Sequence, residues 1–364
     1  MPNKKVLQKR LIIGFILAVV ILAGAPQGAV AQQEPGEGVT VQPARATWKT
    51  GYFLEAIYSM GLEELGYTVA APRDMSSPDF YKALDQGEVD FWANGWFPLH
   101  NSQLSPDFED RASLVDRVVS NGAVQGYLVS KDHAARYDIT SLEDFKRDEV
   151  KQAFDSNDDG KADMVACPEG WGCAKVIAHH MEAYNLKEHI NLVTSDYNAD
   201  MENALQRHSR GEPVLFYTWT PNWTVGKLQP GQDVVWINVP EINPASSQKG
   251  LGDAMVAQNL QGAVTSPIRL GYAVNDIRVA ANDEFLNNNP AAKKFFQVME
   301  VPLEDIARQN EKMFEGEDDQ EAIERHAREW IENNSEFWED CLEKARSNLG
   351  NLWSATESGQ TAQR

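Results

Sequence analysis

The sequence predicts an α/β protein with two lobes and a ligand cleft between them, and three observations predict this fold class. Strand and helix patterns alternate over residues 39–93, and a second alternating series covers residues 126–239. After about residue 290 only helical patterns remain, and such helices must bury their apolar faces on another element. We expect them to pack on the first α/β unit, so that the chain crosses between the lobes more than once. A cleft between such lobes is a natural place for a small ligand.

Apolar periodicity and helix-start signals define the elements of the first α/β unit. The expected elements, in order, are strand 39–41, helix 50–65, strand 67–70, helix 77–86 and strand 89–93. Ser77 is the expected N-cap of the second helix because Pro78 suits the first helical position. This β-α-β-α-β order predicts a mostly parallel sheet covered by helices.

The second α/β unit carries signals of the same kinds. Its expected strands are residues 126–130, 190–193, 214–217 and 234–239, and its expected helices are residues 173–184 and 199–209. Ser141 and Asp144 have the spacing of a capping box at the start of a further helix. The remaining expected elements are a loop at residues 243–265, a strand at residues 271–274, and helices near Pro290, Pro302 and Cys341.

These patterns divide the chain into a signal peptide, two lobes and a tail. We expect the signal peptide at residues 1–31, lobe 1 in two parts at residues 32–125 and 267–349, lobe 2 at residues 126–266, and a polar tail at residues 350–364. The first 31 residues combine a basic start, an apolar run and an Ala-Val-Ala cleavage site. A membrane anchor is the alternative, but the apolar run is short for a spanning helix. The mature protein is therefore expected in the periplasm.

The chain is acidic, with 54 Asp and Glu against 33 Lys and Arg and a formal net charge of −21 at pH 7. This balance argues against nucleic acid or an anionic membrane as a partner. It is typical of a soluble surface, or of adaptation to a saline habitat. The sequence contains no G-x-S-x-G, H-E-x-x-H or Walker A motif, which argues against hydrolysis and ATP use. We expect a monomer that binds a small molecule and is not an enzyme.

Three cysteines in an exported chain suggest one disulfide and one remaining thiol. Cys167 and Cys173 are the pair we expect to be joined, because two cysteines six residues apart can close a small ring. Cys341 falls on the apolar side of a helical pattern, which predicts a buried, unreactive thiol.

Three tryptophans, Trp96, Trp171 and Trp219, are expected in loops that display large aromatic rings. Glycine, proline or threonine residues surround each of them. A quaternary ammonium cannot donate hydrogen bonds, so the faces of electron-rich rings are its main source of attraction. The three rings therefore suggest a box for a cationic small molecule, although tryptophans that follow strands also occur in cores.

Candidate donors for an anionic group lie close to two of these tryptophans in the sequence. His100 follows Trp96 by four residues, and the backbone amides of Gly172 and Cys173 lie at the start of a predicted helix. A ligand with a methylated ammonium at one end and a carboxylate at the other would satisfy both kinds of group. Betaines have this form.

Two further clusters could bind metal. Asp155, Asn157, Asp159 and Asp163 occupy ligand positions of a calcium loop, but Ala166 stands where a bidentate glutamate belongs. A structural calcium and a metal-free Asx turn both remain open. His179, His180 and Glu182 are expected to form the polar face of a helix rather than a zinc site.

Four blocks of the sequence, residues 94–100, 154–163, 170–173 and 217–221, closely resemble the periplasmic glycine betaine/proline betaine-binding proteins of ABC importers. The resemblance extends from about Val39 to the final helix. Phe97, where the family is expected to have threonine, and residues 243–267 depart from it.

The resemblance implies a type II periplasmic binding protein that delivers glycine betaine or proline betaine to a permease for osmoprotectant uptake, with the ATPase on a separate chain. It implies a Cys167–Cys173 disulfide, and it places the aromatic cage on Trp96, Trp171 and Trp219 and the carboxylate donors on His100 and the amides of Gly172 and Cys173. Two alternatives remain open: choline or carnitine as the ligand, and a secreted metal-dependent enzyme that uses Asp155, Asp159 and Asp163.

Overall fold

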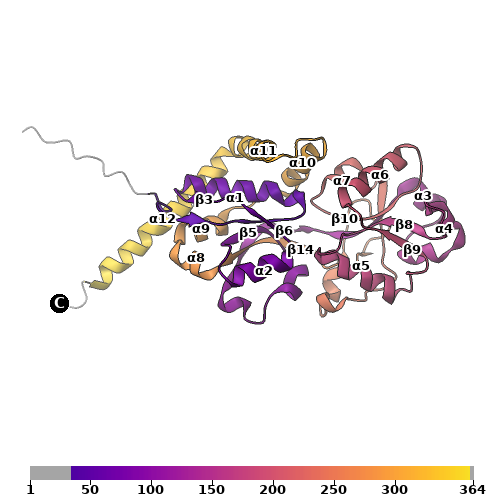
Figure 1. The fold of residues 1–364 in the computed structure, drawn as a ribbon, viewed down its shortest axis with the longest axis horizontal. Helices are drawn as coiled ribbons and strands as arrows, with labels where there is room; N and C mark the ends of the chain where they lie inside the picture. Colours follow the sequence, from indigo (N-terminus) through magenta and orange to yellow (C-terminus); the bar gives the residue numbers. More distant parts are fainter. Residues whose placement is uncertain (1–33, 361–364) are drawn as a thin grey trace, which may run out of the picture. The chain divides into compact units, whose positions relative to one another are not determined.

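The computed structural model describes the backbone of residues 34–360 and, apart from residues 120–121 and 348–360, their side chains. The predicted signal peptide lies outside the described residues, as do residues 361–364 of the predicted tail. Within residues 34–360, no helix is both long and apolar enough to cross a membrane. The helices and strands form two groups, each built around a sheet (Figure 1).

The first sheet has three strands in the order β5-β14-β6 and is antiparallel throughout. These strands are β5 (Phe91–Phe97), β14 (Asn275–Asn282) and β6 (Ala112–Ala123). Two short parallel pairs precede them in the chain: β1 (Thr40–Val41) with β3 (Thr68–Val69), and β2 (Ala44–Ala46) with β4 (Arg73–Met75). The segments predicted as strands 39–41 and 67–70 do pair in parallel, and Pro43 forms a parallel bridge to Phe91 at the start of β5. The prediction of a mostly parallel sheet is wrong only for the three-stranded sheet that β5 joins, because its central strand returns from a distant part of the chain and runs against both neighbours.

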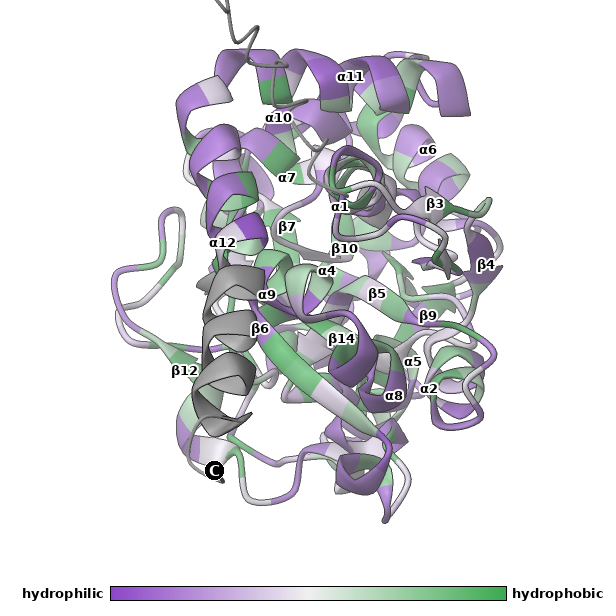
Figure 2. Ribbon diagram, turned by 90° about the vertical axis from the view of Figure 1, so that its left-hand side faces the viewer, coloured by the Kyte–Doolittle hydropathy of each residue, from purple (hydrophilic) through white to green (hydrophobic). Residues whose placement is uncertain are grey.

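Helices from both ends of the described chain pack around the first sheet (Figure 1). They are α1 (Tyr52–Glu64), α2 (Ser77–Asp85), α8 (Asp283–Asn288), α9 (Pro290–Val298), α10 (Leu303–Phe314), α11 (Gln320–Asn333) and α12 (Ser335–Gln360). Figure 2 shows α11 as largely hydrophilic, whereas β6 carries clearly hydrophobic stretches. Helix α11 packs against α1 and α12 against α9, so the terminal helices pack on the first α/β unit, as the sequence predicts.

Details at two helices test the predicted patterns. The N-cap of α2 is Ser76 rather than Ser77, because the Ser76 hydroxyl accepts the backbone N–H of Asp79. Cys341 on α12 is buried, which confirms the predicted core thiol. The same helix extends to Gln360, so residues 350–360 of the predicted polar tail are helical.

The second sheet has five strands in the order β11-β7-β10-β8-β9. Its strands are β7 (Gln125–Ser130), β8 (Ala162–Val165), β9 (Ile190–Val193), β10 (Leu215–Trp219) and β11 (Val234–Ile237). Its helices are α3 (Lys131–Arg136), α4 (Asp148–Phe154), α5 (Gly172–Ala183), α6 (Tyr197–Ser209) and α7 (Trp223–Lys227). Strand β8 pairs in parallel with β9 and β10, whereas β7 pairs antiparallel with β10 and β11. The two sheets with their helices confirm the predicted α/β class.

Short elements complete the described chain. The 3-10 helices are η1 (Lys49–Gly51), η2 (Leu99–Gln103), η3 (Phe108–Asp110), η4 (Leu142–Lys146), η5 (Ser246–Gln248) and η6 (Gly252–Met255). The predicted capping box of Ser141 and Asp144 is present at the start of η4. Strands β12 (Val256–Ala257) and β13 (Ile268–Arg269) form an antiparallel pair within the region predicted as a loop and just after it.

The predicted strand at residues 271–274 is misplaced, since β14 begins only at Asn275. Gly271 has a φ of 73°, which interrupts the extended conformation that a strand requires. Strand β13, which precedes Gly271 in the chain, is attached to the second unit. The Arg269 N–H of this strand donates to Oδ1 of Asn238, the residue after β11, at 2.9 Å. The predicted division between the lobes at residues 266 and 267 stays a prediction.

Helices α7 and α10 contact each other although one follows the second sheet and the other packs with the first. The rings of Trp223 and Phe314 are stacked, with centroids 3.8 Å apart and an angle of 11° between planes. Lys227 forms an ion pair with Glu315 at the same contact. This contact links the two groups of helices at a point outside either sheet.

Candidate ligand-binding site

One pocket brings together every residue that the sequence predicts for ligand binding. Trp96, His100, Trp171, Gly172, Cys173 and Trp219 all line it, and its volume is about 40 Å³. Trp48, Leu99, Gln125 and Tyr217 line the same pocket, and the sequence did not predict them. The pocket therefore takes residues from both sheets and from the segments that follow them.

Two of the three predicted tryptophans lie in strands rather than in loops. Strand β5 continues through Asn94 and Gly95 to include Trp96, and Trp219 is the last residue of β10. Asn94 Oδ1 accepts the indole N–H groups of Trp96, at 3.2 Å, and of Trp48, at 2.8 Å. One amide oxygen thus fixes two indoles on the side of the first sheet.

The tryptophan rings contact one another. The ring centroid of Trp171 is 5.5 Å from that of Trp219 and 5.8 Å from that of Trp48, and both contacts are edge to face. Tyr197 supports the cluster from α6, with its ring centroid 4.9 Å from that of Trp219. A cation binds over a ring face within about 6 Å of its centroid, so these rings must separate to hold one between them.

His100 presents a neutral imidazole to the pocket. Its Nδ1 lies 3.2 Å from the backbone nitrogen of Trp96 and 2.9 Å from the Tyr81 hydroxyl. Because a backbone N–H can only donate, Nδ1 accepts, and the single proton of the neutral ring is on Nε2. Burial lowers the pKa of His100 to about 3, so the ring stays neutral near pH 7. The Nε2–H is therefore a donor without positive charge.

The N-terminus of α5 supplies further donors. Trp171 is its N-cap residue, and no side chain caps the first turn. The amides of Gly172 and Cys173 have no intrahelical acceptor at these positions and lie at the positive end of the helix dipole. A Cβ at position 172 would lie 3.2 Å from Leu99 Cδ2, so glycine allows the close approach of η2.

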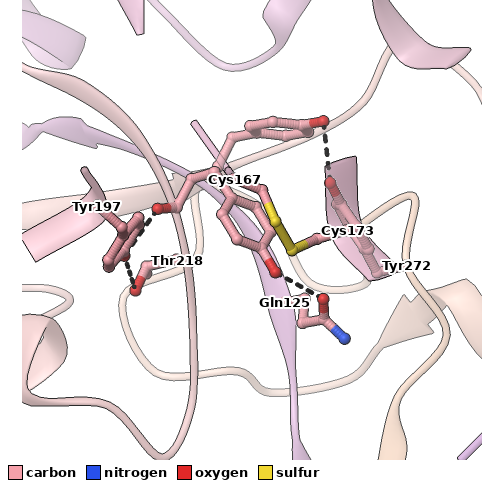
Figure 3. Close-up of a disulfide and its surroundings, with 8 residues drawn as sticks. Gln125, Cys167, Cys173, Tyr197, Thr218 and Tyr272 are labelled. Atoms are coloured by element: carbon pink, nitrogen blue, oxygen red, sulfur yellow. Dashed lines mark hydrogen bonds between the residues drawn. A yellow bond between two sulfur atoms is a disulfide. The ribbon is translucent and has the colours of Figure 1, made fainter. Parts of the chain in front are cut away.

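The disulfide between Cys167 and Cys173 is present, which confirms the predicted pairing (Figure 3). It closes a ring of the chain that includes Trp171. The two Cα atoms are 5.9 Å apart. Because Cys173 belongs to the first turn of α5, the bond ties this turn to the segment that follows β8. It thereby restricts the positions of Trp171 and of the first amides of the helix.

The acidic loop is closed by its own hydrogen bonds. The Asp155 carboxylate accepts the backbone N–H groups of Asp159, at 3.1 Å, and Gly160, at 2.8 Å. Asp163 accepts the Ser156 N–H at 2.8 Å and the Asn191 side-chain amide at 2.8 Å. Among the described residues, no group of three His, Cys, Asp or Glu side chains is arranged to hold a metal ion.

A second buried histidine corrects the prediction for α5. His180 is fully buried rather than part of a polar face, and its Nδ1 lies 2.7 Å from the Tyr127 hydroxyl. Its other ring nitrogen is packed against Gly271, where a Cβ would lie 2.9 Å from Nε2. Burial, together with neighbouring His179, lowers the pKa of His180 to about 3.

The fold and the pocket define a substrate-binding protein with two α/β lobes. Comparison with known sequences agrees with this class. The chain belongs to the family of substrate-binding domains of ABC-type glycine betaine transport systems, whose family model matches residues 39–333. Its relatives are transport proteins that bind substrates.

Two curated relatives cover most of the chain. The glycine betaine-binding periplasmic protein OusX of Dickeya dadantii is 38% identical over 313 residues, which are 86% of this chain and 92% of that protein. The glycine betaine/proline betaine-binding periplasmic protein of Salmonella typhimurium is 35% identical over 317 residues, 87% of this chain and 93% of that protein.

A solved structure shows the same fold at lower sequence identity. The glycine/betaine/L-proline-binding protein of an ABC transporter from Borrelia burgdorferi superimposes with a TM-score of 0.64 and is 16% identical, covering 85% of this chain and 99% of that one. At this identity, the likeness supports the two-lobed fold and carries no information about the ligand.

Proposed function

We propose that this protein captures glycine betaine or proline betaine in the periplasm and delivers it to an ABC permease, for uptake of an osmoprotectant. One observation carries the proposal: a single pocket combines tryptophan rings with the neutral Nε2–H of His100 and the uncapped N-terminus of α5. The names of the curated relatives support it. The permease and its ATPase are separate chains, and the protein itself acts as a carrier rather than an enzyme.

The two ends of a betaine require different partners. In this proposal the faces of Trp96, Trp171 and Trp219 bind the methylated ammonium, each contributing about 0.5–2 kcal/mol when desolvated. Micromolar affinity requires about 8 kcal/mol, so the rings need help from groups that bind the carboxylate. His100 and the amides of Gly172 and Cys173 are the proposed donors.

Capture requires the lobes to open, because the rings of Trp171, Trp219 and Trp48 contact one another in the described form. We propose that a betaine enters the open form and bridges the lobes as they close. Since the ligand interacts with both lobes only in the closed form, binding shifts the population towards that form. The closed, loaded protein is then the form that docks on the permease.

Calorimetric titration of the mature, oxidised protein with glycine betaine, proline betaine and choline tests the proposal. Tight binding of a betaine with weak binding of choline is the expected result, and Trp219→Ala is expected to weaken betaine roughly tenfold or more without unfolding the protein. If choline binds more tightly than either betaine, the cage remains and the carboxylate site is wrong. If none of the three binds, the proposed function is wrong.

For the acidic loop we propose a hydrogen-bonded turn with no cofactor, and structural calcium remains the alternative. The hydrogen bonds that already satisfy Asp155 and Asp163 support the turn. An ion that binds only the folded state raises the melting temperature. An equal melting temperature in calcium and in chelator would support the turn, whereas a clear rise in calcium would support a bound ion at Asp155, Asn157, Asp159 and Asp163.

A further inference from the structure

Gln125 lies directly beside Trp219 in the second sheet. The two residues are paired across the antiparallel ladder of β7 and β10, so their side chains are neighbours on the same face of the sheet. Tyr217, two residues before Trp219, shares this face. Gln125 is 2% exposed and lines the aromatic pocket. A polar side chain is therefore buried next to a proposed cage residue.

The hydroxyl of Tyr217 fixes the orientation of the Gln125 amide. It donates to Gln125 Oε1 at 2.6 Å, and Figure 3 draws this bond as a dashed line at the labelled Gln125. The Tyr217 hydroxyl has no other acceptor among the described residues, and in this orientation the oxygen of the Gln125 amide faces it and accepts its proton. The amide nitrogen, with its two N–H groups, consequently points away from that hydroxyl.

This nitrogen has no hydrogen-bond partner among the described residues, although it is buried. The Nε1–H of its neighbour Trp219 is also without a partner there. On the side of the first sheet the indole N–H groups of Trp48 and Trp96 are both satisfied by Asn94. Buried polar groups in native proteins are rarely left unpaired. Gln125 Nε2 and Trp219 Nε1 are thus unpaired donors on the face of the second sheet, in addition to the Nε2–H of His100 and the amides of α5.

We propose that Gln125 is a specificity-determining residue that donates its Nε2–H to the carboxylate of the bound ligand. The inference rests on the proposed function, since it assigns a third kind of carboxylate donor to the same pocket. A neutral N–H favours an anionic acceptor and gains nothing beside a methylated ammonium, which offers no acceptor. Gln125 therefore favours zwitterionic betaines over choline.

Two substitutions at position 125 separate the donor from the shape of the side chain. Gln125→Leu removes the donor and the acceptor, whereas Gln125→Glu keeps an acceptor for Tyr217 and adds a negative charge. We expect Gln125→Leu to weaken glycine betaine roughly tenfold or more, as for the loss of a hydrogen bond to a charged group. Gln125→Glu should weaken it further by charge repulsion, while choline is not weakened or binds more tightly.

Tyr217→Phe serves as the matched control, because it removes the hydroxyl that holds the amide but leaves the Gln125 donor in place. Its effect on betaine affinity should be smaller than that of Gln125→Leu. Melting temperatures and near-ultraviolet circular dichroism show whether each variant is folded.

The outcomes distinguish the inference from the function on which it rests. Failure of the unmodified protein to bind any betaine would overturn the proposed function. If the unmodified protein binds betaine and folded Gln125→Leu and Gln125→Glu bind it equally well, the role of Gln125 is wrong. Equal weakening of betaine and choline by Gln125→Glu would also overturn it, because that pattern indicates a loss of packing.

Discussion

Two buried tyrosine–histidine pairs, one in each α/β unit, look alike and differ in one respect. Nδ1 of His100 lies 2.9 Å from the Tyr81 hydroxyl, and Nδ1 of His180 lies 2.7 Å from the Tyr127 hydroxyl. Burial lowers the pKa of each histidine to about 3. However, His100 lines the aromatic pocket, whereas Nε2 of His180 is closed off by the backbone of Gly271.

The comparison teaches that burial and a lowered pKa do not identify a ligand-binding histidine. Both pairs share these properties, and desolvation of an imidazole is sufficient to explain them. What distinguishes the pairs is the surroundings of the second ring nitrogen. A nitrogen that faces a pocket can bind a ligand, and one that faces the backbone can only support packing.

The largest expected effect is on stability, in His180→Ala. Removing a fully buried ring leaves a cavity and the Tyr127 hydroxyl without its histidine partner, which should lower the free energy of unfolding by about 2–5 kcal/mol. Chemical denaturation measures this loss. The folded fraction should bind glycine betaine with unchanged affinity, and a weakening like that of a pocket variant would break the comparison.

The next effect is on binding, in His100→Ala. Loss of a hydrogen bond to a charged carboxylate, about 1.5–3 kcal/mol, should raise the dissociation constant for glycine betaine roughly tenfold to a hundredfold. His100→Gln offers an amide N–H close to the position of Nε2 and should recover part of the affinity. Titration calorimetry checks both variants. Equal loss of choline binding would show that His100 acts on packing and not on the carboxylate.

Acid should destabilise the protein through both histidines alike. Each is neutral in the folded protein down to a pKa of about 3, whereas an unfolded histidine binds a proton near pH 6.5. The unfolded state therefore binds more protons between these values, so this stability is complete above pH 6.5 and is lost as the pH falls towards 3. The expected loss at pH 5 is about 2 kcal/mol for each histidine.

Denaturation at pH 8 and pH 5 of the unmodified protein, His100→Gln and His180→Gln measures this effect. Each variant should lose about 2 kcal/mol less than the unmodified protein between the two pH values. A clearly smaller difference for His100→Gln would show that its ring can be protonated through the pocket, which would sharpen the contrast with His180.

The smallest effects are expected for the two tyrosines. Tyr127→Phe should lower the free energy of unfolding by about 1 kcal/mol, the usual contribution of one hydrogen bond. Tyr81→Phe should change the affinity for glycine betaine by less than about threefold, because the Trp96 amide still holds Nδ1 of His100. Denaturation and calorimetry measure the two. A large loss of affinity in Tyr81→Phe would make Tyr81 the main positioning residue.

Local patterns in the sequence predict much of the helical structure. Helix α1, the capping box at η4 and the buried thiol of Cys341 all follow from apolar periodicity or cap residues, which act within a few positions. His180 was misjudged because its α5 position alone does not show that Tyr127 and Gly271 enclose it.

Long-range strand pairing explains most of the remaining differences. Strand β6 was not predicted, and β5 was expected to end at residue 93. Strand β14 pairs with both of them, opposite Gly95 and Trp96 in β5, and keeps the chain extended through residues that favour a turn. Such pairing depends on residues almost two hundred positions away, beyond the reach of a local pattern.

The candidate site divides in the same way. The tryptophan motifs and the family resemblance predicted six residues that line the pocket, and their role in binding stays a proposal. These residues are Trp96, His100, Trp171, Gly172, Cys173 and Trp219. Gln125 was missed because only its register with Trp219 brings it there. Trp48 was missed because only folding brings it against Trp171. A glutamine or a tryptophan between predicted elements carries no local signal of a site.

The stacked rings of Trp223 and Phe314 lie outside the aromatic pocket, and the contact between them involves no ligand. If the lobes move apart to admit a betaine, as proposed, this contact breaks on opening and forms again when the lobes close on the ligand. It therefore stabilises the closed, loaded form against the open form whichever ligand is enclosed. The contact tightens the binding of every ligand by the same factor. It determines how dilute a solute the protein can retain, and leaves the choice between a betaine and choline to the pocket.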